Sequence, residues 1–112
     1  MDKVIENKSF NFAKRIIRAY RYLISKKEIL SKQLMRSCTS IGANVVEAQY
    51  VISKKEFRNK MSIALKEAAE SRYWITLLKD EDFLSEKEAD SLLDDLEEII
   101  KILSKIVKNA NT

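Results

Sequence analysis

The sequence predicts an all-α protein, an antiparallel up-down-up-down four-helix bundle that occupies residues 1–112 as a single domain. Its 112 residues include one glycine and no proline, which argues for long helices with short connections. Apolar residues recur at helical spacing in four separate segments. The composition, 46% hydrophobic and 34% charged, is typical of a globular protein. Four helices joined by short connections favour an up-down-up-down bundle.

The first helix is predicted over residues 10–27, with Ser9 as its N-cap. Its apolar stripe, predicted to face the core, has helical spacing and consists of Ala13, Ile16, Ile17, Tyr20, Leu23 and Ile24. The opposite face is predicted to be basic and to carry the residues Asn11, Lys14, Arg15, Arg18, Arg21, Tyr22 and Lys26.

The third and fourth helices are predicted over residues 54–79 and 86–109, each behind an S-x-x-E capping box. The two boxes are formed by Ser53 with Glu56 and by Ser85 with Glu88. The fourth helix has a continuous apolar stripe from residue 89 to residue 107. Its acidic residues come early, whereas Lys101, Lys105 and Lys108 come late. That order complements the helix dipole, which is a sufficient explanation for these charges.

The second helix, predicted over residues 29–50, is unusual because residues 37–46, SCTSIGANVV, carry no charge. A surface helix of a small bundle is expected to present charged residues on its outer face. Threonine, valine, glycine and asparagine are weak helix formers, so a partly strand-like or loop-like segment is the alternative.

A second copy of the chain is the simplest cover for the uncharged helix, and a homo-oligomeric ring is therefore predicted. The third helix supports this prediction with a second apolar stripe of Ile63, Trp74 and Leu77. Glu47 and Glu70 are hypothesised to be partly buried, paired with Arg36, Arg72 or polar groups of the second helix, and to hold the register within or between subunits. The subunit-interface or register candidates are Gln33, Ser37, Ser40, Asn44, Glu47, Ile63, Glu70 and Trp74.

The residue inventory argues against an enzyme and against a bound cofactor or metal. The chain has no histidine, which excludes histidine-based acid–base catalysis, the serine and cysteine triads, and histidine-containing zinc sites. The single cysteine, Cys38, lies in the apolar stripe of the second helix and is predicted to be a core residue. A di-metal site on Glu47, Glu67 and Glu70 is disfavoured without histidine ligands.

Charge is divided unevenly along the chain. Residues 1–66 contain 15 Lys and Arg against 5 Asp and Glu, whereas residues 67–112 contain 6 against 12. Clustered cations neutralise phosphates, so nucleic acid is a predicted partner. The binding candidates are Lys14, Arg15, Arg18, Arg21, Lys26, Lys54, Lys55 and Arg58. The alternatives are a solvated surface and pairing with the acidic fourth helix of a neighbouring subunit.

Two further features bear on setting and recognition. Residues 1–9 lack the apolar core of a signal peptide and no segment is apolar enough to span a membrane, so a soluble, cytoplasmic protein is expected. Trp74 beside Tyr73 has the chemistry of a base-stacking platform. Its position on the second apolar stripe favours a subunit interface instead.

Two motifs resemble one known family. The run LSKQLMRSCTSIGANVVEA at residues 30–48 and the run FRNKMSIALKEAAESRYW at residues 57–74 are similar to the four-helix bundle proteins encoded in intervening sequences of bacterial 23S rRNA genes. The resemblance implies a homopentameric ring of antiparallel bundles. It extends to the accessory variability determinant of diversity-generating retroelements, which assists a reverse transcriptase and binds nucleic acid through a basic surface.

Two functions follow as hypotheses. The first is a non-enzymatic, oligomeric accessory protein that binds RNA or DNA. The second is a protein-interaction scaffold, for example a reverse-transcriptase accessory subunit.

Overall fold

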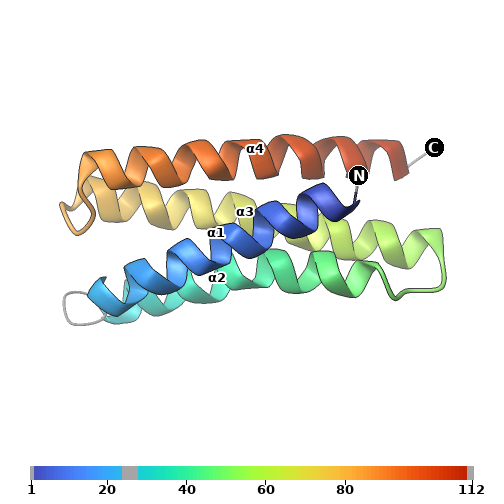
Figure 1. Cartoon of the computed structure of the whole chain (residues 1–112), viewed down its shortest axis with the longest axis horizontal. Helices are drawn as coiled ribbons and strands as arrows, with labels where there is room; N and C mark the ends of the chain where they lie inside the picture. The colour runs from blue at the N-terminus through green and yellow to red at the C-terminus, as the bar shows by residue number, and fades with distance from the viewer. Residues whose placement is uncertain (1, 24–27, 111–112) are drawn as a thin grey trace.

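The computed structural model describes residues 2–23 and 28–110, and these form four α-helices in a bundle of 43 × 19 × 19 Å. The helices are α1 (Asp2–Leu23), α2 (Glu28–Ala48), α3 (Lys54–Asp80) and α4 (Glu86–Ala110). Consecutive helices are joined at alternating ends of the bundle (Figure 1). The all-α, four-helix prediction is confirmed, and the uncharged segment 37–46 is helical throughout rather than strand or loop.

The predicted start of the first helix was wrong. α1 begins eight residues before Phe10, at Asp2, and Ser9 lies fully buried inside it. The Ser9 hydroxyl donates a hydrogen bond to the carbonyl oxygen of Ile5, 2.8 Å away. The hydroxyl therefore has a hydrogen-bond partner within α1, and Ser9 is not an N-cap. The predicted end, at residue 27, lies outside the described residues.

In both predicted capping boxes the hydrogen bond from the glutamate amide to the serine hydroxyl is confirmed. Ser53 has an extended backbone (φ −125°, ψ 154°), and its hydroxyl accepts a hydrogen bond from the Glu56 amide. Ser85 accepts the equivalent bond from the Glu88 amide, also at 3.1 Å. Each bond satisfies one of the amide groups that a helix start leaves without an intrahelical partner.

α3 ends in a Schellman turn that contains no glycine. Asp82 adopts a left-handed backbone (φ 62°), the amide of Phe83 donates to the Leu78 carbonyl, and the Asp82 amide donates to the Lys79 carbonyl. This pattern satisfies the last carbonyl groups of α3 and turns the chain sharply into α4.

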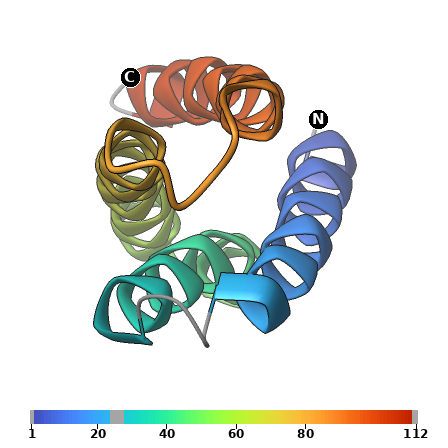
Figure 2. The ribbon, with the colours of Figure 1, turned by 90° about the vertical axis from the view of Figure 1, so that its left-hand side faces the viewer.

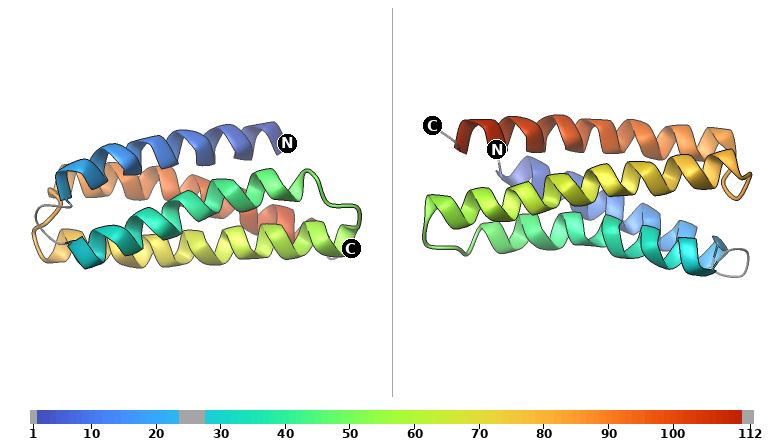
Figure 3. Two further views of the ribbon diagram at one scale, coloured as in Figure 1. Left: turned by 90° about the horizontal axis from the view of Figure 1, so that it is seen from below. Right: turned by 180° about the vertical axis from the view of Figure 1, so that it is seen from behind.

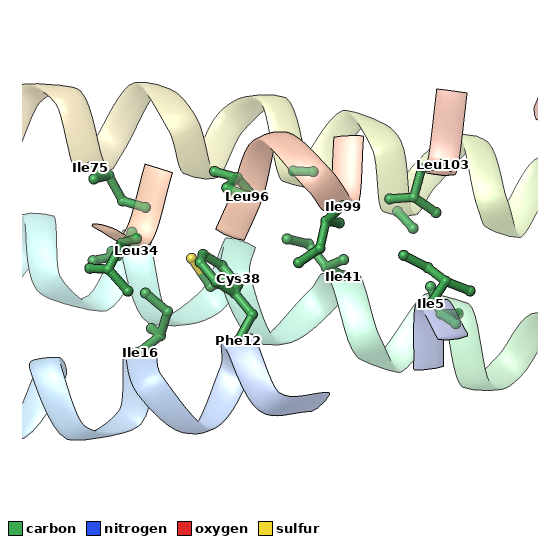
Figure 4. Packing of buried hydrophobic residues seen from close by; sticks show 14 of the residues in the cluster. Ile5, Phe12, Ile16, Leu34, Cys38, Ile41, Ile75, Leu96, Ile99 and Leu103 are labelled. Atoms are coloured by element: carbon green, nitrogen blue, oxygen red, sulfur yellow. The ribbon is translucent and has the colours of Figure 1, made fainter. Parts of the chain in front are cut away.

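The core is built by all four helices along the length of the bundle (Figure 4). The predicted inner stripe of α2 is confirmed: Leu34, Cys38, Ile41, Val45 and Ala48 are all buried. Ile5 and Phe12 of α1 were not predicted as core residues, yet both are buried, whereas the predicted core residue Ile17 is 37% exposed. Each fully buried large side chain contributes about 1.5–3 kcal/mol of transfer free energy.

The helices surround the core in the order α1, α2, α3, α4, seen end-on in Figure 2. Each packs against its two neighbours, and the contact between α1 and α4 is the least extensive of the four. Within the described ranges the backbones of α2 and α4 do not approach each other, because they lie on opposite sides of the core. The outer faces of α2 and α4 therefore point away from each other.

Candidate nucleic-acid interface

Arg15, a predicted nucleic-acid ligand, is instead held against α4 of its own chain. Its guanidinium lies 2.5 Å from the Asp95 carboxylate and 3.7 Å from that of Glu88. It also donates to the Ser91 hydroxyl at 3.1 Å. Only 27% of the Arg15 side chain is exposed. The ion pairs leave Arg15 little free charge to offer a phosphate.

Other carboxylates of α4 are matched in the same way. Lys8 of α1 binds Glu98, Arg72 of α3 binds Glu97 at 2.8 Å, and Lys79 of α3 binds Asp90 at 2.7 Å. The hydrogen bond from Lys8 lowers the pKa of Glu98. The hydrogen bond to Asp90 raises the pKa of Lys79. Five of the seven carboxylates of α4 are thus paired with described cations of their own chain, whereas the sequence-based alternative assigned such pairing to a neighbouring subunit.

The remaining α1 candidates are exposed. The ammonium group of Lys14 lies 5.6 Å from the centre of the Phe10 ring, a cation–π arrangement within one helix. Arg18 and Arg21 are exposed near the end of α1. Arg18 lines a cleft of about 660 Å³ that is floored by Phe83 and Leu84 of the α3–α4 connection. Lys26 lies outside the described residues.

The α3 candidates lie at the other end of the bundle. Lys54 and Lys55 are exposed in the first turn of α3, and Arg58 is half-buried one turn later. α3 begins at the end of the bundle opposite to that where α1 finishes (Figure 1). The structure therefore does not bring Arg18 and Arg21 together with the α3 cations on one protomer, as the predicted surface required.

Ser37, Ser40 and Asn44 form a polar stripe along α2, and its hydrogen bonds are made largely within α2 and to α3. Ser37 is buried and hydrogen-bonds with the Ser71 hydroxyl of α3 at 2.9 Å. The Asn44 side chain donates to the Ser40 carbonyl at 2.8 Å. Both Ser40 and Asn44 remain half-buried rather than exposed. The stripe therefore joins α2 to α3 at Ser37 and becomes partly accessible toward Asn44.

Arg36 is the centre of a polar cluster at the seam between α2 and α3. It forms ion pairs with Glu67, at 3.1 Å, and with Glu70. Its Nε donates to the side-chain oxygen of Gln33 at 3.2 Å. The Trp74 indole donates to Glu70 at 2.9 Å. The predicted pairing of Glu70 with an arginine is therefore present within one chain.

Glu47 does not follow the same prediction. Its side chain is exposed and pairs with Lys60 of α3 at 2.7 Å. Position 47 follows the last charge-free turn of α2, where the outer surface becomes polar again. Arg72, proposed as a partner for these glutamates, binds Glu97 of α4 instead.

Apolar side chains remain on the outer surface near α2. Phe10 and Val46 are exposed and line a groove of about 410 Å³ between α1 and α2, together with Ala13, Gly42 and Ala43. Ile63 and Tyr73 are exposed on α3, and the Tyr73 ring packs edge-on to Trp74 with centroids 5.1 Å apart. Large apolar side chains are thus exposed on both helices that pack against α2.

Cys38 is a core residue, as predicted. It is fully buried, and burial raises the pKa of its thiol from 9.0 to about 12. The group stays protonated at neutral pH, which makes it a poor nucleophile or metal ligand.

Sequence reasoning overlooked three cations on α4. Lys101, Lys105 and Lys108 are all exposed, and the sequence-based interpretation assigned them to the helix dipole alone. Their spacing of four and three residues places them on one helix face, which is the signal that could have identified them.

Comparison with known proteins shows the family of this four-helix chain. The 23S rRNA-intervening sequence protein family model matches residues 1–105. The chain belongs to this family. A crystal structure of a protein of unknown function from the S23 ribosomal protein family of Bacteroides thetaiotaomicron is also similar. It shares 42% sequence identity at a TM-score of 0.91, over 96% of this chain and 97% of that one. No curated protein matches the chain. Among the described residues of this family member, no helix is long and apolar enough to cross a membrane.

Proposed function

We propose that this protein is a non-enzymatic, cytoplasmic accessory protein that assembles into a homo-oligomeric ring of antiparallel bundles and binds RNA or DNA. The observation that carries the proposal is that acidic side chains are paired within the chain while many basic side chains stay exposed. Within the described residues, five of the seven acidic side chains of α4 are paired, with Lys8, Arg15, Arg72 and Lys79. Other cations of this chain, whose net charge is +4, remain exposed to solvent. Exposed cations of this kind attract phosphates without reading sequence.

Assembly is supported by the surface around α2. The outer residues of this helix carry no charge between positions 37 and 46, and exposed apolar side chains lie beside it on α1 and α3. An apolar surface rimmed by polar groups is typical of a protein–protein contact. The family resemblance supplies the number five for the ring.

A non-enzymatic role is supported by the same inventory of side chains. The chain has no histidine, and its one thiol is buried with a raised pKa. In the cleft that Arg15 and Glu88 line, these two side chains already form an ion pair. The family name refers to intervening sequences of 23S rRNA, and RNA is accordingly the first nucleic acid to test.

Light scattering of the purified protein at moderate salt, with and without a structured RNA, tests the proposal. One chain has a mass of 13.0 kDa. We expect a native mass about five times larger, because the ring covers α2, and a further rise when RNA is added. A monomer would contradict the ring. An oligomer whose mass does not respond to RNA would contradict nucleic-acid binding.

A protein-interaction scaffold is the second candidate, and the α2–α3 connection favours it. Tyr50 is 83% exposed and Ile52 is 95% exposed in this connection. Large apolar side chains presented on a short connection are suited to insertion into a partner protein, such as a reverse transcriptase. A wild-type protein that ignores RNA but binds such an enzyme, and loses that binding on Ile52→Ser, would favour this function.

A further inference from the structure

The outer face of α4 carries a row of three lysines over its last three turns. Lys101, Lys105 and Lys108 are exposed, while Ile99, Leu103 and Ile106 on the opposite face are buried in the core. Residues separated by four and three positions lie on the same face of a helix. The lysines thus form a stripe that points away from the bundle.

The helix dipole does not account for the whole stripe. Its effect is confined to about the last turn of a helix. α4 ends at Ala110, so Lys108 lies within reach of the dipole, whereas Lys101 is more than two turns from the end.

Ion pairing within the chain does not account for the stripe either. No described carboxylate forms an ion pair with Lys101, Lys105 or Lys108. Lys101 lies close enough to Glu98 to contribute weakly to lowering its pKa, but the hydrogen bond to Glu98 comes from Lys8. Glu97, the other carboxylate at the start of the stripe, binds Arg72.

α3 extends the stripe across the neighbouring helix. α3 and α4 lie side by side, and the first turns of α3 are at the same end of the bundle as the end of α4 (Figure 3). α3 contributes the exposed residue Lys54, and no described carboxylate forms an ion pair with it either. Lys54 lies eighteen positions, five full turns, before Arg72, which binds Glu97 of α4, and it is therefore on the α4 side of α3.

We propose that this lysine strip, formed by Lys54, Lys101, Lys105 and Lys108, binds the phosphate backbone of nucleic acid. The inference rests on the proposed function and assigns it to α3 and α4 rather than to α1. Lysine ammonium groups act as mobile point charges on flexible stems. A strip of them binds the backbone of either RNA or DNA through counterion release, without base recognition.

The place of the strip in the fold is compatible with assembly. α2, whose uncharged surface is proposed to face other copies, lies diagonally across the core from α4. Subunits that meet through α2 leave the outer face of α4 open on every copy. Repetition of the strip around an oligomer raises the effective concentration of cations for a long nucleic acid.

Two triple variants with the same change of charge test the strip. K101E/K105E/K108E removes the α4 part, and K14E/R18E/R21E reverses three exposed cations of α1 as the matched control. The probe is a short RNA duplex, with a DNA duplex of the same sequence beside it, titrated between about 50 and 200 mM NaCl. K101Q/K105Q/K108Q, which removes charge while keeping good helix formers, is measured in parallel.

We expect the α4 variant to weaken binding by about ten- to a hundredfold and to reduce the salt slope by up to about three, because each lost phosphate contact removes roughly 0.9. The α1 variant should change both quantities much less. A larger loss in the α1 variant, or equal losses in both, would overturn the strip while leaving nucleic-acid binding intact. If the wild type itself binds neither duplex, the proposed function fails. If K101E/K105E/K108E does not fold, as judged by circular dichroism, the glutamine variant decides by the same criterion.

Discussion

The helices α2 and α4 lie on opposite sides of one core, and their outer faces differ in charge. Both bury a regular apolar stripe: Cys38 and Ile41 are as fully buried in α2 as Leu96 is in α4. Outside, α4 presents charge at nearly every turn, and five of its seven carboxylates are paired with described cations of α1 and α3. The outer residues of α2 carry no charge between positions 37 and 46.

The difference shows which helix faces are complete in a single chain and which keep apolar surface exposed. α4 has the pattern of a surface helix, with an apolar inner face and a solvated, ion-paired outer face. The surroundings of α2 retain exposed apolar groups such as Phe10 and Val46. We infer that α4 is built for solvent and for charged ligands, and α2 for contact with another copy.

The sharpest way to break this comparison is to place the same charged residue on both outer faces. Val46, 44% exposed on α2, and Ser104, exposed on α4, are each changed to glutamate. V46E should weaken assembly by about 2–5 kcal/mol, because an unpaired carboxylate would be buried between subunits. S104E should leave the native mass unchanged. Light scattering over a dilution series measures both.

Chemical denaturation provides the control for that experiment. Because both positions are at the surface, each variant should stay within about 0.5 kcal/mol of the wild type once it is dissociated. If V46E assembles as well as S104E does, α2 is not the subunit contact.

The second prediction concerns Glu70, which bonds Arg36 and Trp74 at the seam between α2 and α3. E70Q removes one ion pair, and because Arg36 is partly exposed and keeps Glu67, we expect a loss of about 1 kcal/mol or less in folding stability. If Glu70 holds the register between subunits, the variant should also dissociate at higher protein concentration.

E97Q is the matched control for Glu70, because Glu97 forms a single ion pair with Arg72 on the α3–α4 seam. A similar small loss of stability with no change in assembly is expected there. Melting curves and native mass, measured for both variants, separate the two roles. Identical behaviour of E70Q and E97Q would remove Glu70 from the assembly surface.

The sequence predicted the helices and their inner faces because periodicity is a local property of the chain. It failed at the start of α1, where a serine suited to an N-cap hid a helix that continues back to Asp2. Four of the seven residues 2–8 are charged, which obscured Ile5 as a core position. A buried serine inside a helix and a serine capping one are indistinguishable until the packing is known.

The candidate interface was harder to predict because it depends on contacts between distant residues. Arg15 and Asp95 are eighty positions apart, and their pairing depends on how α1 and α4 are rotated against each other. The separation of Arg18 from Lys54, by contrast, follows from the up-down-up-down order itself. In that order the first helix ends, and the third begins, at opposite ends of the bundle.

The smallest expected effect lies at Gly42, the only glycine of the chain, in the middle of α2. A Cβ atom built there would lie 3.6 Å from the Ser9 hydroxyl oxygen of α1, which is an ordinary van der Waals contact. G42A should therefore raise the stability of the chain by about 0.5–1 kcal/mol, because alanine loses less backbone entropy in a helix than glycine does. Thermal melting below the concentration of assembly measures this gain.

The native mass of G42A then sharpens the contrast between the helices. If assembly weakens while the single chain becomes more stable, a neighbouring subunit packs against the backbone of α2 at this point, and the glycine serves the contact between copies. If assembly is unchanged, the subunit contact lies elsewhere along the uncharged face. A loss of stability in the dissociated chain would mean that α1 and α2 pack more tightly at Ser9 than the 3.6 Å separation indicates.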